Sequence, residues 1–314
     1  MSLAAVFPGQ GSQAIGMLAG LSDRFSLVRE TFQQASDVLG IDLWSLAQHG
    51  PREELDQTAL TQPIMLTAGV AVWRAWDEEG GCAPVMLAGH SLGEYTALVC
   101  AGSIDYEEAV RLVAERGRLM QQAVSSGDGS MAAILGLSDE RVVELCNEAA
   151  QGEVVEAANY NAPGQVVVAG HVAAVERLMN LARGAGAKRV VPLPVSVPSH
   201  CSLMAPAAKA LREVLAKVEI RPPRIPVIHN YDVLQHDDPE AIREALVRQL
   251  DHPVRWVEVV ETLAGEGVTR VFEFGPGKVL SGLTKRIDRS LKVLCIEDSK
   301  SLDAGLNVCE EFGV

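Results

Sequence analysis

The 314-residue sequence is short of aromatic and of basic residues, and each shortage excludes something. Phe, Trp and Tyr make up 4% of the chain, so Val, Leu and Ala must fill most of the core, as they do in closely packed α/β layers. The 27 Lys and Arg residues are outnumbered by 41 Asp and Glu residues, which gives a net charge of -14. Such a charge argues against nucleic acid or another extended polyanion as a partner.

Long apolar runs and paired cysteine spacings are also missing. No uninterrupted apolar stretch approaches the roughly 18 residues that a membrane helix needs, and the first residues do not resemble a signal peptide. We therefore expect a cytoplasmic protein with no membrane partner. The cysteines lack C-x-x-C spacing in a chain long enough to fold without disulfides, so we expect reduced thiols and no metal site. They are Cys82, Cys100, Cys146, Cys201, Cys295 and Cys309.

The pattern of strands and helices indicates an α/β protein with an interrupted large domain. Residues 83–89 and 268–275 are apolar strands that run into glycine-containing turns and then helices, which is typical of a parallel sheet covered by helices. Between residues 130 and 195 the order becomes βαββαβ, the ferredoxin-like unit. We expect an α/β-hydrolase-like large domain at 1–123 and 197–314, interrupted by a small ferredoxin-like domain at 124–196.

The opening stretch AAVFPGQGSQAIG matches the spacing of a dinucleotide-binding loop at Gly9, Gly11 and Ala14. That interpretation also requires a second strand with an acidic end about 20 residues later. Residues 21–39 instead show the three- and four-residue apolar spacing of an amphipathic helix. The turn therefore presents its backbone N–H groups to something other than a dinucleotide, and we expect no cofactor.

The segment GHSLGEYTAL, after the strand at 83–89, contains a G-x-S-x-G motif. Glycines two residues before and two residues after Ser91 allow a turn from strand to helix so sharp that the serine projects from the sheet edge as a nucleophile. The alternative is an incidental turn in which Ser91 merely caps the helix. Strand, motif and helix occur in the order that the nucleophile hypothesis requires.

A serine nucleophile needs a base, and two of the seven histidines lie where a strand-like run gives way to a new segment. His200, in PVSVPSHCSLM, begins the return to the large domain and would lie over the cleft. His229, in IPVIHNYD, is the other candidate, or a satisfied residue at a strand end. Position favours His200.

Arg116 falls on the apolar stripe of the helix EEAVRLVAERGRLMQQA, whereas Arg111 and Arg118 fall on its polar side. A guanidinium that faces the core is costly unless it is paired, and its fork matches a carboxylate. Its partner is either an internal Asp or Glu or the carboxylate of a substrate.

The opening loop also suits acyl transfer. A tetrahedral acyl intermediate needs two N–H donors, one from the residue after the nucleophile and one from a neighbouring loop. Leu92 and Gln10 occupy those positions, so we expect them to form an oxyanion hole.

Six motifs together resemble one family: FPGQGSQ, GHSLGEYTAL, ERGRLMQ, NYNAPGQVVVAG, VSVPSHCSLM and FEFGPGKVLSGL. They are similar, in order and over nearly the whole chain, to the malonyl-CoA:acyl carrier protein transacylases of bacterial fatty acid synthesis. They also resemble the acyltransferase domains of polyketide and animal fatty acid synthases. The resemblance implies transfer of malonyl from malonyl-CoA to the phosphopantetheine thiol of acyl carrier protein, through an acyl-enzyme on Ser91.

The resemblance also assigns roles to individual residues. It makes His200 the base and acid, Arg116 the ligand of the malonyl carboxylate, and Gln10 and Leu92 the oxyanion hole. The main-chain carbonyl of Gln249 would orient the histidine, which explains why no triad carboxylate is evident. Two further positions match residues that line the family's cleft, Gln62 and Asn161.

Two other functions remain open on the sequence. A serine thioesterase or esterase would use the same turn with water as acceptor, and a scaffold would not acquire an acyl group at all. A buried arginine favours a diacid acyl group and a dry cleft favours a thiol acceptor.

The acidic carrier protein must meet a local basic surface, for which we expect Lys285, Arg286 and Arg289, with Lys188 and Arg189 as the next candidates. An ordinary solvated helix face explains the first group equally well.

Overall fold

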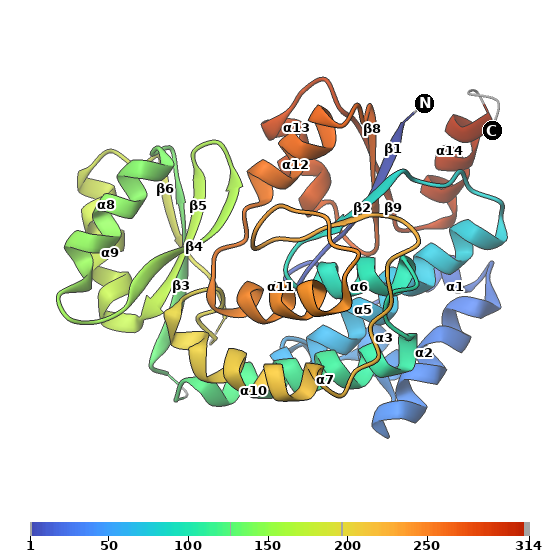
Figure 1. Ribbon diagram of the computed structural model, residues 1–314, viewed down its shortest axis with the longest axis horizontal. Helices are drawn as coiled ribbons and strands as arrows, with labels where there is room; N and C mark the ends of the chain where they lie inside the picture. Colours follow the sequence, from blue (N-terminus) through green and yellow to red (C-terminus); the bar gives the residue numbers. More distant parts are fainter. Residues whose placement is uncertain (1, 126, 196, 311–314) are drawn as a thin grey trace.

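The computed structural model describes residues 2–125, 127–195 and 197–310, which form two sheets beside each other (Figure 1). The larger sheet lies on the right of the view, and the smaller one lies on the left. The expected combination of a parallel sheet with a small ferredoxin-like sheet is confirmed. The domain limits at 123/124 and 196/197 stay a prediction, and residues 1, 126, 196 and 311–314 of those ranges lie outside the described residues.

The larger sheet has five parallel strands in the order β7-β2-β1-β8-β9. Its register pairs Phe7 with Gly89 and Val6 with Glu273, so the carboxyl ends of β2, β1 and β8 meet at one edge. Such an edge is where sites gather in open α/β sheets. The strands are β1 (Leu3–Phe7), β2 (Met86–Gly89), β7 (Val227–Ile228), β8 (Arg270–Phe274) and β9 (Lys292–Ile296).

Helices bury both faces of this sheet, which is why its strands are mostly apolar. Leu3, Ala5 and Phe7 of β1 face one core, and Ala4 and Val6 face the other. The second face is covered by α12 (Trp256–Gly265) and α13 (Val279–Ile287). The first is covered by α1 (Ala19–Ser22), α2 (Ser26–Leu39), α3 (Leu43–His49), α4 (Arg52–Leu55), α5 (Thr58–Glu78), α6 (Leu92–Cys100), α7 (Tyr106–Ala123), α10 (Ala205–Leu215), α11 (Pro239–Asp251) and α14 (Ser299–Glu310).

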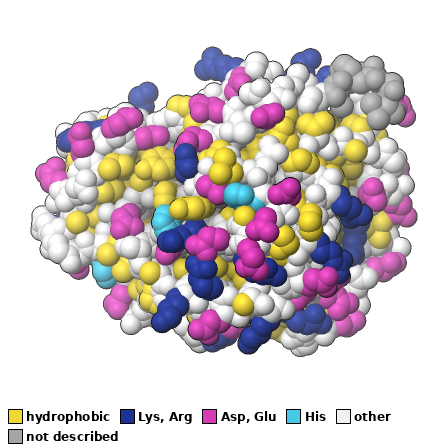
Figure 2. Space-filling model, viewed as in Figure 1, with side chains coloured by type: hydrophobic (Ala, Val, Ile, Leu, Met, Phe, Trp, Pro, Cys, Tyr) yellow, Lys and Arg dark blue, Asp and Glu magenta, His cyan; other side chains and the backbone are white. Residues whose placement is uncertain are grey.

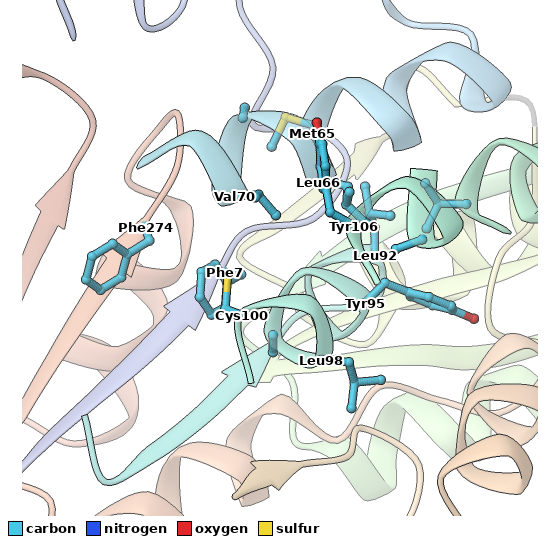
Figure 3. Packing of buried hydrophobic residues seen from close by; sticks show 14 of the residues in the cluster. Phe7, Met65, Leu66, Val70, Leu92, Tyr95, Leu98, Cys100, Tyr106 and Phe274 are labelled. Carbon is cyan, nitrogen blue, oxygen red and sulfur yellow. The ribbon is translucent and has the colours of Figure 1, made fainter. Parts of the chain in front are cut away.

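Helix α6 lies at the centre of the first layer. Figure 3 shows its apolar side chains packed among residues of α5, α7, β1 and β8, including Leu66, Tyr106, Phe7 and Phe274. The ring centroids of Phe7 on β1 and Phe274 on β8 lie 6.0 Å apart, so the two neighbouring strands pack against this layer together. The core therefore holds α6 rigidly, and with it the residue that precedes the helix.

The smaller sheet is antiparallel with the strand order β4-β5-β3-β6, the ferredoxin-like arrangement. Helices α8 and α9 cover one face, and the Ser138 side chain caps α8 by accepting a hydrogen bond from the Arg141 N–H. The other face packs on Cys201 and Leu203. The elements are β3 (Gly129–Leu135), α8 (Asp139–Ala150), β4 (Val155–Ala162), β5 (Gln165–His171), α9 (Val172–Gly184) and β6 (Arg189–Pro192), followed by the short helix η1 (Ser202–Met204).

A backbone bridge joins the two sheets' domains. The N–H of Tyr160 donates to the Val254 carbonyl at 2.9 Å, and the N–H of Val254 donates to the Ala158 carbonyl at 2.9 Å. These bonds continue the outer edge of β4 onto the segment that leads into α12. The small domain is thus tied to the large one at a second place besides the chain crossings.

The expectation of six reduced cysteines is wrong for two of them. Cys82 and Cys309 form a disulfide across 227 residues of sequence, because the fold lays α14 against the segment between α5 and β2. Cys100, Cys146, Cys201 and Cys295 are buried free thiols.

Among the described residues, no helix is both long and apolar enough to cross a membrane. That part of the chain also has no cluster of His, Cys, Asp and Glu residues that could hold a metal ion.

Candidate active site

Ser91 stands at the turn between β2 and α6 with φ 52° and ψ -105°, a backbone conformation that L-residues rarely adopt. The two flanking glycines permit it. A Cβ on Gly93 would come within 2.0 Å of the Phe7 carbonyl oxygen, and one on Gly89 would come within 1.9 Å of the Gly93 backbone. Strain of this kind persists only where the surroundings enforce it, and it concentrates at functional sites.

His200 faces this serine from the segment between β6 and η1, where the chain returns to the larger sheet. Its Nε2 lies 2.7 Å from Ser91 Oγ, and its Nδ1 lies 2.7 Å from the Gln249 carbonyl oxygen. Because a carbonyl only accepts, Nδ1 carries the proton, and Nε2 accepts the hydrogen bond from the serine hydroxyl. His200 also has a positive φ, 64°.

Burial and the nearby positive charge of Arg116 lower the pKa of His200 to about 3, although the Gln249 carbonyl opposes the shift. The imidazole is therefore neutral at physiological pH. A neutral imidazole with a free Nε2 lone pair is the form that can remove a proton from serine.

Arg116 of α7 is 1% exposed, and its guanidinium reaches the same hydroxyl. Nη2 donates to Ser91 Oγ at 3.2 Å and to Gln249 Oε1 at 2.9 Å, and Nη1 donates to Gln62 Oε1 at 2.9 Å. Within the described part of the chain these partners are neutral, and no carboxylate forms an ion pair with Arg116. Of the two partners left open by the sequence, the internal Asp or Glu is thus not found.

The side chains meet in a cavity of about 130 Å³ between the two domains. Gln10 and Leu92 both line it beside Ser91, and Leu92, as the first residue of α6, has a backbone N–H with no carbonyl partner inside the helix. The positive end of the α6 dipole points to the same place. The other lining residues are Thr58, His90, Arg116, Met120, Met131, Asn159, Leu193, Val195, Val197, Ser199 and His200.

Gln62 and Asn161 are near the cavity but do not line it. Gln62 is buried and holds Arg116, while Asn161 Oδ1 lies 2.8 Å from His90 Nε2. Asn159, two residues earlier on β4, is the residue of that strand that lines the cavity. Regular alternation along a strand would direct both asparagines to the same face. The register of β4 instead shifts between Ala157 and Asn159 and again between Tyr160 and Ala162, so the two side chains part.

His229, the rival base, lies away from Ser91 and is fully buried. Its Nδ1 is 2.7 Å from Glu94 Oε1. Glu94 belongs to a buried polar group that the sequence interpretation missed, together with Asn230 and the side chain of Gln249. The available signal was a glutamate on an otherwise apolar helix directly after the motif, which requires buried partners.

The residues expected to meet carrier protein are exposed. Lys285 and Arg286 lie in the last turn of α13, and Arg289 follows the helix. Arg286 also contacts Gln165 of the small domain, and it lines one surface depression together with Lys188 and Arg189. The two basic groups considered separately on the sequence thus adjoin each other. On the face that Figure 2 shows, Lys and Arg side chains are interspersed with Asp and Glu side chains.

The arrangement can activate a serine hydroxyl, receive an oxyanion and hold an anionic acyl group. An α/β protein with these groups at the carboxyl edge of its sheet is equipped for acyl transfer through serine.

The comparisons with known proteins agree. Residues 5–289 match the model of the acyl transferase domain family. The malonyl CoA-acyl carrier protein transacylase of Escherichia coli K12 is 55% identical, over 97% of this chain and 99% of its own. The corresponding Bacillus subtilis protein is 42% identical, over 98% of each chain.

Solved structures show the same relationship. An acyl carrier protein S-malonyltransferase from Vibrio cholerae has a TM-score of 0.95 at 57% identity. The match covers 97% of this chain and 99% of the Vibrio cholerae chain. A malonyl-transacylase solved in complex with a type II PKS acyl-carrier protein has a TM-score of 0.97 at 55% identity, with 98% and 100% of the chains covered. This chain belongs to the acyl transferase domain family and, within it, to the malonyl CoA-acyl carrier protein transacylases. It is therefore an acyltransferase.

Proposed function

We propose that this chain moves a malonyl group from malonyl-CoA to the phosphopantetheine thiol of acyl carrier protein in two displacements at Ser91. The observation that carries the proposal is the Ser91 hydroxyl itself, which contacts both the neutral imidazole of His200 and the guanidinium of Arg116. One contact supplies the base, and the other supplies a cation beside the acyl group.

In the first displacement, Nε2 of His200 takes the hydroxyl proton while Ser91 Oγ bonds to the thioester carbon. The carbonyl oxygen becomes an oxyanion, which the backbone N–H groups of Gln10 and Leu92 receive at the positive end of α6. When the C–S bond breaks, the proton passes from His200 to the departing CoA sulfur. Ser91 then carries the malonyl group as an ester.

The second displacement reverses these roles. The thiol of the carrier protein gives its proton to His200 Nε2, and its sulfur attacks the ester carbon. The bond between the malonyl carbonyl carbon and Ser91 Oγ breaks, and Oγ recovers the proton from the imidazole. All groups return to their starting state, so the cycle needs no cofactor.

Arg116 selects the acyl group. The free carboxylate of malonyl replaces the serine hydroxyl as a ligand of the guanidinium, whose other contacts, Gln62 and Gln249, are neutral amides that leave its charge uncompensated by a direct ion pair. The supporting feature is burial, because a charged pair is stronger in a site that excludes water.

A hydrolase would use the same serine, and the fate of the acyl-enzyme separates the two reactions. Malonyl-enzyme is isolated after loading and divided between buffer and buffer with holo carrier protein. We expect rapid loss of the malonyl group to the carrier thiol and slow loss to water. Equal rates in both samples would favour a thioesterase or esterase.

We further propose that carrier protein docks on the basic surface formed by Lys285, Arg286 and Arg289 of the α13 region and by Lys188 and Arg189 of the small domain. Arg286, Lys188 and Arg189 line one depression, which supports a single docking surface that spans both domains. The service of fatty acid rather than polyketide synthesis, and a cytoplasmic location, remain predictions of the sequence.

A further inference from the structure

The most deeply buried carboxylate near the site takes no part in the reaction just described. Glu94, on the first turn of α6, is 0% exposed. Its Oε1 lies 2.7 Å from Nδ1 of His229, and its Oε2 accepts from the Asn230 backbone N–H at 2.9 Å and from Gln249 Nε2 at 2.8 Å. Three donors from two distant segments thus converge on one side chain, which only accepts.

This convergence fixes the orientation of two amide side chains. Gln249 Nε2 must face the Glu94 carboxylate and the Ser91 carbonyl, 3.0 Å away, so its Oε1 faces Arg116. Asn230, held through its own backbone N–H, directs Oδ1 to the Ser91 N–H at 2.7 Å and Nδ2 to the Gly89 carbonyl at 2.7 Å. Both backbone polar groups of the strained serine are therefore held by amides that Glu94 anchors.

Through Gln249, Glu94 also affects Arg116 and His200. The Gln249 residue presents its side-chain oxygen to Arg116 and its main-chain oxygen to His200 Nδ1. A displacement of Gln249 would shift the cation and the base together. Reacting groups must be held to within a fraction of an ångström, and a misplacement of about 1 Å can cost about 10²-fold in rate.

We infer that Glu94 is the positioning residue of the site: through Gln249 and Asn230 its carboxylate sets the geometry of Ser91, His200 and Arg116. It acts by hydrogen-bond geometry and touches no reacting atom. The inference rests on the proposed function, since it assigns a support to that same acyl-transfer site.

Geometry and charge can be separated at this position. Glutamine keeps the length of the side chain. In E94Q the new amide can leave its oxygen toward Asn230 and Gln249 and turn its NH₂ toward His229, whose Nε2 is buried without a partner among the described residues and can take the proton that Nδ1 gives up. Aspartate keeps the charge but withdraws the carboxylate by one methylene.

The experiment measures single-turnover loading of Ser91 from malonyl-CoA and from acetyl-CoA in wild type, E94Q and E94D. We expect E94Q to load malonyl within about threefold of wild type, because its hydrogen bonds are retained. We expect E94D to load it about 10²-fold more slowly, and its malonyl-to-acetyl preference to fall about tenfold because Arg116 is no longer aligned.

A matched control is Glu273, a fully buried glutamate that holds the start of α13 through the N–H groups of Leu280 and Ser281. E273D should lower the melting temperature and leave the malonyl-to-acetyl preference unchanged. If E94D loads like wild type, or if E94Q loses as much as E94D, the positioning role is overturned. A wild-type enzyme that forms no malonyl-Ser91 would instead overturn the proposed function.

Discussion

The guanidinium of Arg116 is buried beside the nucleophile and contacts neutral amides, so its preference between acyl groups can be measured directly. Malonyl offers it a carboxylate, and acetyl offers it nothing. We expect R116A to lower the ratio of kcat/KM for malonyl-CoA over acetyl-CoA by about 10²-fold, since a buried charged pair is worth several kcal/mol. R111A, on the exposed side of the same helix, is the control and should keep the ratio. Equal losses for both substrates in R116A would place the arginine in a structural role.

The lowered pKa of His200 predicts an unusual acid limit. Burial and Arg116 depress this pKa to about 3, so the base stays neutral as the pH falls through 6.5, the ordinary value for histidine. We expect the kcat/KM for acetyl loading to hold its plateau below that value in wild type. In R116A, where one cause of the depression is gone, the acid limb should move to higher pH.

An acid limb that starts near 6.5 in wild type, or that does not move in R116A, would contradict this assignment.

The lowered pKa of His200 also affects stability. Between 6.5 and about 3 the unfolded chain binds a proton at this histidine that the folded chain does not, so its contribution to the free energy of unfolding falls as the pH is lowered through that window.

Among the elements, the turn from β2 into α6 depends most on the absence of side chains. A Cβ on Gly93 would come within 2.0 Å of the carbonyl oxygen of Phe7, a backbone atom of the central strand that cannot move aside. We expect G93A to lower the free energy of unfolding by about 1–3 kcal/mol and to abolish most loading of Ser91. Thermal melts and single-turnover loading measure the two effects.

Gly282, in the exposed side of α13, is the matched control, because a Cβ there meets nothing within 4 Å. G282A should raise stability by about 0.5–1 kcal/mol, the usual gain in a helix interior, with loading unchanged. If G93A melted and loaded like G282A, the sharp turn would not be required.

Local patterns were sufficient to predict most elements. The period of apolar residues in 107–123 predicted α7 and placed Arg116 on its buried face. The strand-turn-helix order around Ser91 predicted the nucleophile turn, and the position of His200 favoured it over His229. The structure has these elements and places His200 beside Ser91, while the catalytic roles stay predictions. Local elements could be predicted because each depends on residues within about one helix length.

At the scale of the whole molecule, the sequence predicted fewer of the contacts, because the partners lie far apart along the chain. Glu94 meets Asn230 across 136 residues and Gln249 across 155, and the Cys82–Cys309 disulfide spans 227. Nothing in local spacing marks such partners, because they are set by which strands neighbour each other in the sheet. Asn161 shows the same limit within one strand, since an irregularity in β4 directs Asn159 to the cavity.

The basic surface that spans α13 and the small domain is also a property of the whole molecule, because a net charge of -14 repels an acidic partner elsewhere. We expect the K285E/R286E variant to raise the KM for carrier protein and to flatten its salt dependence, with malonyl loading from CoA nearly unchanged. Steady-state kinetics at several salt concentrations measure this. Unchanged kinetics in K285E/R286E, followed by a raised KM in K188E/R189E, would confine docking to the small domain.

The central claim is that Ser91 carries the malonyl group, and the intact mass of the protein after incubation with malonyl-CoA tests it most directly. We expect the mass to rise by one malonyl group in wild type, with peptide mapping placing it on Ser91. The S91A variant should show no adduct, and H200A should form it about 10²- to 10⁴-fold more slowly, the usual value of general-base help. An adduct that persists in S91A, or loading at the wild-type rate in H200A, would contradict the account.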